Sequence, residues 1–161
     1  MAKFYSTKTY GNDRGLSCCF RQWRATHSHC STLHGYSIGI KLIFECDTLD
    51  DKNWCMDFGG LKEFKAWADY MFDHTLIIAE DDPHIEIFKM LNEVEGGFDN
   101  SGICDLRIVP GVGCEMFAKL AYDKMAELLA AGNMSYPINP TVRVKSVEVF
   151  EHGANSATYE N

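Results

Sequence analysis

The amino-acid sequence predicts an α+β fold in which helices pack on one face of a small antiparallel sheet. Apolar residues alternate with polar ones in two early stretches and again near the end of the chain, as in half-buried strands. Between these stretches, apolar residues recur at the three-and-four spacing of amphipathic helices. The order strand, strand, helices, strand is that of an α+β domain.

The strands are predicted from alternation and residue type. Residues 16–26 (LSCCFRQWRAT) alternate loosely and predict a first strand, and residues 36–45 (YSIGIKLIFE) predict an antiparallel second one. Residues 106–109 (LRIV) are a brief strand-like stretch. Residues 142–151 (VRVKSVEVFE) alternate strictly and are rich in valine, which favours a long strand, and a short closing strand is predicted at 157–159.

Three helices are predicted between the strands. Residues 57–72 have the amphipathic spacing, with Asp57 placed to cap the first turn. Residues 83–94 form a short acidic helix that Asp82 can cap and that two glycines end. Residues 114–131 (CEMFAKLAYDKMAELLAA) form the third and longest helix.

Composition indicates one globular domain over residues 1–161, with 46% apolar and 24% charged residues and no repeat or linker. The first residues lack the apolar core of a signal peptide, so we expect a cytoplasmic protein whose seven cysteines stay reduced. A net charge of −8 argues against nucleic acid or an anionic membrane as a partner. The open edges of so small a sheet predict a homo-oligomer.

Three histidines, His27, His29 and His34, fall within eight residues where the first predicted strand gives way to the second. Residues two apart in a strand point to the same side, so His27 and His29 can converge while His34 approaches from the neighbouring strand. Three imidazoles leave one open position on zinc, as in catalytic zinc sites. The alternatives are ordinary polar residues in a hairpin, or a closed structural site in which Cys30 is the fourth ligand.

The thiol of Cys30, beside His29, is expected to act as a base or nucleophile, and the other six cysteines are expected to serve in packing. The adjacent Asp73 and His74 offer a proton relay, or a compensating charge at a helix end. Glu151 ends the most regular strand, where a carboxylate can accept two parallel N–H bonds from an amidine-like heterocycle edge, or simply be solvated.

Five short motifs in order along most of the chain resemble the 6-pyruvoyl-tetrahydropterin synthase and 6-carboxy-tetrahydropterin synthase family. They are the aromatic-x-Ala-x-His pattern of Trp23, Ala25 and His27; Cys30 followed by Leu33, His34 and Gly35; MDFGGLK at 56–62; Phe72, Asp73 and His74; and Glu151 with Tyr159. The resemblance implies the tunnelling fold (T-fold), a small sheet with two main helices on one face that assembles into barrel-like oligomers. It also implies hexamers or tetramers with active sites at subunit interfaces.

The chain departs from the family pattern at the third zinc ligand, because Tyr36 stands where the family has a histidine. We therefore predict that His29 completes a zinc site with His27 and His34. Residues 80–105 resemble an insertion. Gly113 and Cys114 stand where the family has hydroxyl residues, so Cys114 and the following Glu115 are expected to contact substrate along with Glu151.

By this resemblance the protein would be a zinc-dependent lyase acting on 7,8-dihydroneopterin triphosphate. Glu151 would hold the pterin edge, Cys30 would remove a proton, and Asp73 with His74 would poise or return it. We favour a 6-carboxy-5,6,7,8-tetrahydropterin synthase of 7-deazapurine (queuosine-type) synthesis over a 6-pyruvoyl-tetrahydropterin synthase of the biopterin route. The alternative of another class is a non-catalytic module that binds zinc or a pterin.

Overall fold

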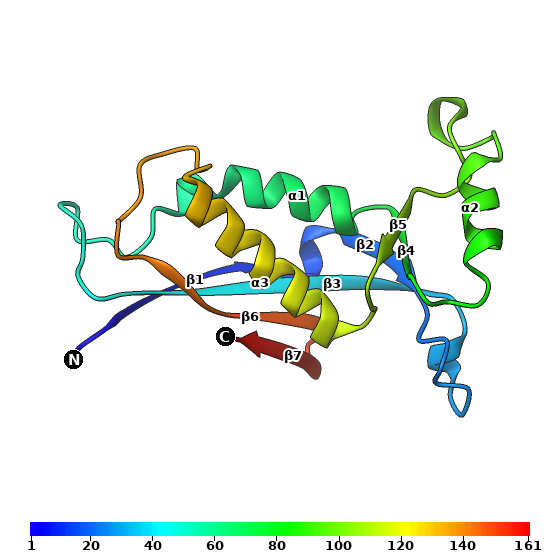
Figure 1. The fold of residues 1–161 in the computed structure, drawn as a ribbon, viewed down its shortest axis with the longest axis horizontal. Coiled ribbons are helices and arrows are strands. Elements are labelled where there is room, and N and C mark those ends of the chain that lie inside the picture. Colours follow the sequence, from blue (N-terminus) through cyan, green and yellow to red (C-terminus); the bar gives the residue numbers. More distant parts are fainter.

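The computed structural model describes residues 1–161 as one elongated sheet with two helices lying along one face (Figure 1). Its seven strands follow the order β5-β4-β2-β3-β6-β7, and β1 pairs with β3 outside that path. The strands are β1 (Phe4–Tyr10), β2 (Leu16–Phe20), β3 (His34–Cys46), β4 (Thr75–Ala79), β5 (Leu106–Val109), β6 (Arg143–His152) and β7 (Asn155–Glu160).

The thirteen-residue strand β3 is the centre of the sheet. Its two halves pair antiparallel with β2 and β1 along one edge, and its other edge pairs antiparallel with β6. The side chains that alternate on its inner face are at most 1% exposed. They are Ile38, Ile40, Leu42 and Phe44. The predicted strand at 36–45 is therefore confirmed, since its alternation matches a sheet with one buried face.

Helices α1 (Lys62–Phe72) and α3 (Cys114–Ala131) cover the same face of the sheet and enclose the main core (Figure 1). Phe72 of α1 meets Phe117 of α3 edge to face, with ring centroids 5.2 Å apart. Asp57 caps the 3-10 turn Phe58–Leu61 ahead of α1, where its carboxylate accepts the Gly59 N–H. No helix of the chain combines the length and apolar character needed to cross a lipid bilayer.

A smaller layer stands at one end of the molecule, formed by α2 (Ile85–Glu93) over β4 and β5 (Figure 1). Its own core contains Leu76, Ile78 and Phe88. Strand β4 pairs parallel with both β2 and β5, so the sheet is mixed and the prediction of an antiparallel sheet is wrong in this part. The chain gains this parallel geometry by crossing over through α1 and α2 between the strands.

Three strand assignments differ from the sequence-based expectation. The first predicted strand ends at Phe20 rather than Thr26, because residues 21–33 leave the sheet as a loop. Strand β1 was not predicted, since FYSTKTY is largely exposed at a sheet edge and shows no apolar face. Strand β4 was not predicted either, because TLIIA is buried at every position and so does not alternate.

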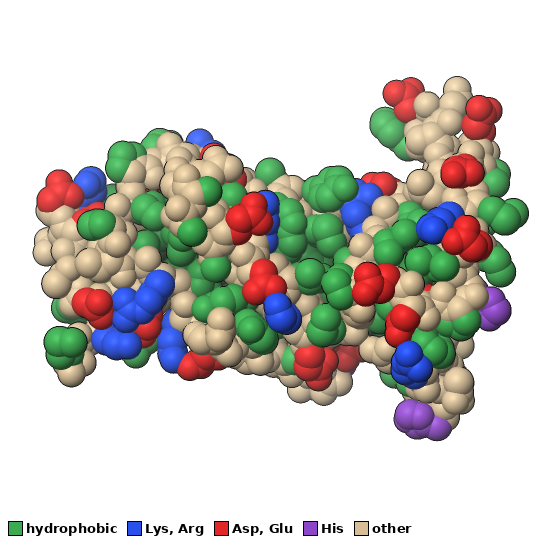
Figure 2. Space-filling view, viewed as in Figure 1, with side chains coloured by type: hydrophobic (Ala, Val, Ile, Leu, Met, Phe, Trp, Pro, Cys, Tyr) green, Lys and Arg blue, Asp and Glu red, His purple; other side chains and the backbone are tan.

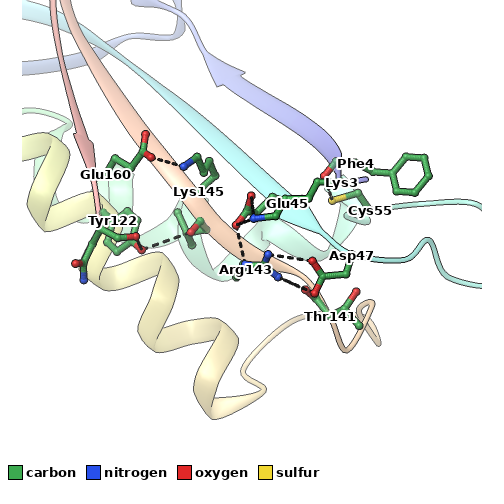
Figure 3. Close-up of polar contacts among 12 residues, drawn as sticks. Lys3, Phe4, Glu45, Asp47, Cys55, Tyr122, Thr141, Arg143, Lys145 and Glu160 are labelled. Atoms are coloured by element: carbon green, nitrogen blue, oxygen red, sulfur yellow. Dashed lines mark hydrogen bonds and ion pairs between the residues drawn. The ribbon is translucent and has the colours of Figure 1, made fainter. Parts of the chain in front are cut away.

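At the far end of the sheet, a buried carboxylate links three parts of the chain (Figure 3). Glu45 of β3 is 6% exposed and accepts hydrogen bonds from Lys3 Nζ (3.2 Å) and from Arg143 Nε (2.7 Å). The same Arg143 also reaches Asp47, at 3.1 Å. These contacts fix the ends of β1, β3 and β6 against one another, where a one-residue bulge interrupts the β3–β6 register.

Candidate active site

A pocket of about 340 Å³ opens at the end of the sheet where β2, β3 and β6 meet the first turn of α3. Thirteen residues line it. They are Phe20, Gln22, Ala25, His27, Ser28, Cys30, Tyr36, Gly113, Cys114, Glu115, Glu151, Asn155 and Ser156. Five of the nine predicted site residues, spread from His27 to Glu151, thus surround one cavity.

The segment of residues 21–33, here called the 21–33 loop, forms one wall of the pocket. The backbone N–H of Gln22 donates to the Cys30 carbonyl oxygen (2.7 Å) and so closes the base of the loop. Ser28 Oγ accepts the Cys30 N–H at 3.1 Å and so caps the 3-10 turn His29–Ser31. Cys30 is the one exposed cysteine of the seven, and its thiol is therefore open to ligands and reagents.

The N-terminal turn of α3 forms the opposite wall. Gly113 has φ 107° and ψ 165°, a conformation that residues with a Cβ rarely adopt, and it directs the chain into the helix. Burial, with the charges of Glu151 and Glu115, raises the pKa of the Cys114 thiol to about 11. Cys114 therefore stays protonated near neutral pH and offers the pocket a weak S–H donor.

Glu151 at the end of β6 and Tyr36 on β3 supply the floor. The Tyr36 ring stacks on Phe20, with centroids 4.1 Å apart and planes 12° from parallel. Burial raises the pKa of Tyr36 to about 12, and the charges of Glu151 and Cys30 add to the effect. Its phenol is thus a neutral hydrogen-bond donor or acceptor near the Glu151 carboxylate.

The three histidines do not gather in this structure. His27 lines the pocket, but His29 and His34 do not, and His34 donates through Nδ1 to the Thr32 carbonyl oxygen (2.8 Å). Nowhere in the chain do three or more His, Cys, Asp or Glu side chains lie close enough together to hold a metal ion. The premise that His27 and His29 share a strand face is wrong, because the strand ends at Phe20.

His27, His29 and His34 are zinc-type donors in or directly beside one loop, but this structure does not bring them together. At the pocket, His27 and Cys30 are accompanied by Tyr36, which stands at the position of the third histidine in the family pattern. The phenol of Tyr36 is protonated and is therefore a poor zinc ligand. A closed site of three histidines and Cys30 is not assembled either. Zinc binding by His27, His29 and His34 remains a prediction.

Asp73 and His74 form a pair away from the pocket. His74 Nδ1 lies 2.7 Å from Asp73 Oδ1, which leaves Nε2 free, and the His74 side chain is 87% exposed. The residue has φ 57°, in the left-handed region, and its N–H donates to the Ser17 carbonyl oxygen at 2.6 Å. The two side chains are thus in contact, but neither of them lines the pocket that holds Cys30.

Sequence reasoning did not identify four polar residues of the pocket. Asn155 and Ser156 begin β7, directly after the two-residue turn that follows β6, and the run HGANS was a usable signal because it is small and polar after Glu151. Gln22 and Ser28 gave no signal, since their positions depend on how the 21–33 loop folds. Figure 2 shows histidine side chains at this same end of the molecule, with acidic and basic groups interspersed elsewhere on that face.

Residues 12–161 match the protein family described as 6-pyruvoyl tetrahydropterin synthase. A 6-carboxy-5,6,7,8-tetrahydropterin synthase of Rickettsia typhi is 35% identical over 68 residues, which are 42% of this chain and 48% of that protein. The chain therefore matches less than half the length of this relative. An Aquifex aeolicus protein of the same name is 27% identical over 134 residues, covering 81% of this chain and 75% of its own.

Solved structures share the fold over the full chain. An uncharacterised protein of Wolinella succinogenes aligns with a TM-score of 0.74 and 20% identity over 100% of this chain and 99% of its own. A Plasmodium vivax 6-pyruvoyltetrahydropterin synthase aligns with a TM-score of 0.65 and 16% identity, with the same coverage of both chains. The family match extends over 150 residues, 12–161, and these solved structures share the fold over the whole chain. The chain therefore belongs to the 6-pyruvoyl tetrahydropterin synthase family.

Proposed function

We propose that this protein is a lyase that binds 7,8-dihydroneopterin triphosphate in the pocket beside the 21–33 loop and converts it to 6-carboxy-5,6,7,8-tetrahydropterin. The observation that carries the proposal is that Cys30, Cys114, Glu115 and Glu151, together with His27, line a single cavity. The names of the Rickettsia and Aquifex relatives support the choice of product.

Recognition of the pterin is assigned to Glu151. A pterin carries adjacent N–H donors on its amidine-like edge, and a carboxylate accepts two parallel N–H bonds from such an edge. The protonated Tyr36 phenol and Cys114 thiol stand beside Glu151 and can bond to the ring's polar atoms. Glu115 lies in the first turn of α3, whose leading N–H groups have no partner within the helix and are free to bond to ligand oxygens.

The proton transfer is assigned to Cys30. As a thiolate it would take the proton from a side-chain carbon next to a hydroxyl, and the triphosphate would then leave with the electrons of its C–O bond. To reach the carboxy product, a water would add to the first side-chain carbon and the bond from that carbon to the next would break. The outer two carbons would then leave as acetaldehyde, and the dihydropterin ring would take up the two electrons that the side chain loses. Asp73 and His74 would return a proton through the free Nε2 of His74. Because this pair lies outside the pocket of its own chain, the proposal requires that a neighbouring copy supply it.

Zinc dependence is part of the proposal, but no step above is routed through the metal. When bound in such a site, zinc polarises a substrate oxygen and acidifies neighbouring protons. We expect zinc in the purified protein by elemental analysis and its loss from His27→Ala and from His34→Ala. Full zinc content in His29→Ala would refute the replacement of the missing third histidine by His29.

The function is tested by incubating the purified protein with 7,8-dihydroneopterin triphosphate and identifying the product by mass spectrometry. Cys30→Ala should keep pterin affinity within about threefold and lose at least about a hundredfold in kcat, as expected when a proton-transfer group is removed. Cys104→Ala, which changes a half-buried cysteine away from the pocket, is the matched control. Undiminished turnover by Cys30→Ala would remove Cys30 from the chemistry.

The product identity separates two enzyme reactions, because a pyruvoyl side chain on the pterin would assign the alternative 6-pyruvoyl-tetrahydropterin synthase activity. A second candidate function is a non-catalytic pterin-binding module. It is favoured by one observation, the absence of a gathered metal-ligand set. Tight pterin binding without turnover by the zinc-loaded protein would select it.

A further inference from the structure

The 21–33 loop is tied to the segment that begins α2 by a buried ion pair. Arg21 donates through Nε and Nη2 to both carboxylate oxygens of Asp82, at 2.9 and 2.8 Å. The Asp82 side chain is 1% exposed and that of Arg21 is 18% exposed. Such a bidentate pair fixes orientation as well as distance.

Asp82 is itself held rigidly by the turn before α2. Its Oδ1 accepts the His84 N–H at 2.9 Å, and its carbonyl oxygen accepts the Ile85 N–H at 3.1 Å. Burial alone would raise the pKa of Asp82, but the hydrogen bonds from Arg21 and His84 and the charge of Arg21 outweigh it and lower the pKa. Asp82 therefore stays ionised at neutral pH and holds Arg21 continuously.

Arg21 also bonds to the part of the loop that carries Cys30, and so links that part to Asp82. Its third donor, Nη1, bonds to the Ser31 carbonyl oxygen at 3.3 Å, directly after Cys30. The next residue, Gln22, closes the loop by donating its backbone N–H to the Cys30 carbonyl oxygen. Its side-chain Nε2 donates to the Val112 carbonyl oxygen at 3.0 Å. One guanidinium thus joins the start of the loop, its return and the turn before α2.

The neighbouring Asp81 makes a second, weaker link to the same loop. It accepts the Trp23 indole N–H at 3.1 Å and an Arg24 N–H at 2.9 Å. Both Asp81 and Arg24 are more than half exposed, and an exposed ion pair contributes little to order. The two adjacent carboxylates therefore contact the same loop from very different environments.

We propose that Asp82 is a positioning residue for the pocket. Through Arg21 it fixes the backbone of the 21–33 loop so that the Cys30 thiol and the His27 imidazole face the cavity. The segment that carries α2 thus sets the geometry of a pocket that none of its residues touches. The effect on catalysis rests on the proposed function, whereas the effect on loop order does not.

The test compares Asp82→Asn with Asp81→Asn, a matched change at the next residue. In Asp82→Asn we expect amide hydrogen exchange of residues 22–32 to accelerate about tenfold or more, since an ordered loop opens more often when its anchor is lost. In Asp81→Asn we expect less than about threefold. The rate of Cys30 alkylation by iodoacetamide on the folded protein should change in Asp82→Asn only.

Kinetics add a readout that general destabilisation would not produce. Asp82→Asn should lower kcat about tenfold and leave pterin affinity within about threefold, because Glu151 and Tyr36 are not attached to the loop's anchor. The double variant Arg21→Gln with Asp82→Asn should lose no more than the single variant, as expected for two residues that act as a pair. If Asp82→Asn does not fold, Arg21→Lys replaces it in these measurements, because this change keeps the charge and loses the bidentate bond.

Wild-type exchange in the loop of folded Asp82→Asn, or of Arg21→Lys in its place, would overturn the proposal. Equal acceleration in Asp81→Asn and Asp82→Asn would do so as well. These readouts need no substrate. A wild-type protein that fails to turn over the pterin would therefore refute the proposed function and still leave the role of Asp82 to be decided by exchange and alkylation.

Discussion

His74 combines an exposed imidazole with a strained backbone. Its φ of 57° lies in the left-handed region, where the other three residues with a Cβ are Asn53, Asp99 and Asn100. Histidine, like asparagine and aspartate, adopts this region more often than most residues do, so the cost at His74 is at most roughly 1 kcal/mol, and an asparagine should bear it at least as well. Strain retained at an exposed histidine is typical of a functional position.

We expect His74→Asn to keep the melting temperature or raise it by about 2–4 °C, because the lost ion pair with Asp73 is exposed and weak. Turnover should fall if His74 returns the proton. Differential scanning calorimetry and steady-state kinetics measure the two effects. His84→Asn, at an exposed histidine with an ordinary φ of −109°, is the control. A clear drop in melting temperature would show that the imidazole stabilises the fold.

Glu45 predicts a stability change at acid pH. Burial would raise its pKa, but the hydrogen bonds and charges of Lys3 and Arg143 outweigh burial and lower it. A carboxyl whose pKa is lower in the folded chain stabilises above its unfolded pKa of about 4.3, and this contribution is lost as pH falls through the folded pKa. Glu45→Gln should therefore cost about 1–3 kcal/mol at pH 7.

The cost of Glu45→Gln should shrink as urea unfolding is repeated at progressively lower pH, from 7 towards 3. Asp47→Asn is the matched control, since Asp47 is half exposed and shares the partner Arg143. A cost of Glu45→Gln that stays constant from pH 7 to pH 3 would show that shape rather than charge stabilises this site.

At the scale of the element, the entry to α3 depends on one glycine. Gly113 has φ 107°, and a Cβ there would meet Gln22 Nε2 at an acceptable 3.5 Å, so backbone strain rather than crowding opposes a side chain. We expect Gly113→Ala to lower the free energy of unfolding by about 1–3 kcal/mol. Gly153→Ala, with open space and no positive φ, should change it by under about 0.5 kcal/mol.

Gly113→Ala should also weaken pterin binding, because the first turn of α3 carries Cys114 and Glu115 into the pocket. Fluorescence titration with a pterin measures this effect. Unchanged affinity together with reduced stability would mean that the helix start is repaired when the ligand binds.

The elements were predictable where one face is buried and the other is wet. Strand β3 and helix α3 satisfy this condition, and their periodicity follows from it. Strand β1 does not, because it lies at an edge with Ser6, Thr7 and Thr9 among its residues. Strand β4 does not either, because parallel neighbours and α2 cover it on all sides, and five buried residues carry no period.

The site was predictable from residue chemistry but not from strand geometry. Cys30 and Glu151 were identified by what a thiol and a strand-end carboxylate can do, and both line the pocket. The path of the 21–33 loop was not predictable, because Asp82 and Val112 hold it through contacts distant in sequence. The separation of His29 from His27 follows from that path.

At the scale of the whole molecule, two functional groups lie apart within one chain. The pocket holds Cys30, whereas His74 lies beyond the end of α1 at a separate depression lined also by Asn92 and Phe98. Strands β5 and β7 end the sheet path with unpaired edges, which favour association with other chains. A homo-oligomer whose copies exchange these groups reconciles the two positions with one proposed reaction.

Mixing inactive variants tests this arrangement. Co-refolded Cys30→Ala and His74→Asn should recover up to about a quarter of wild-type activity, since random assembly restores that share of sites with both native groups. Cys30→Ala mixed with Glu151→Gln should recover none, because both changes fall in the same pocket. Light scattering should give a mass well above the 18.2 kDa of one chain. A monomeric active enzyme would contradict shared sites.

The central position of β3 also has a consequence for how the chain is made. One edge of β3 pairs with β1 and β2, which the ribosome has already released when β3 emerges, whereas the other edge waits for β6, so that Ile40 cannot meet Val149 until synthesis is nearly complete. During that interval an apolar strand has one unsatisfied edge, which is a template for mispairing between nascent chains. A lower density of nascent chains should therefore increase the yield of folded protein, whereas slower translation between β3 and β6 lengthens the interval and should reduce the yield.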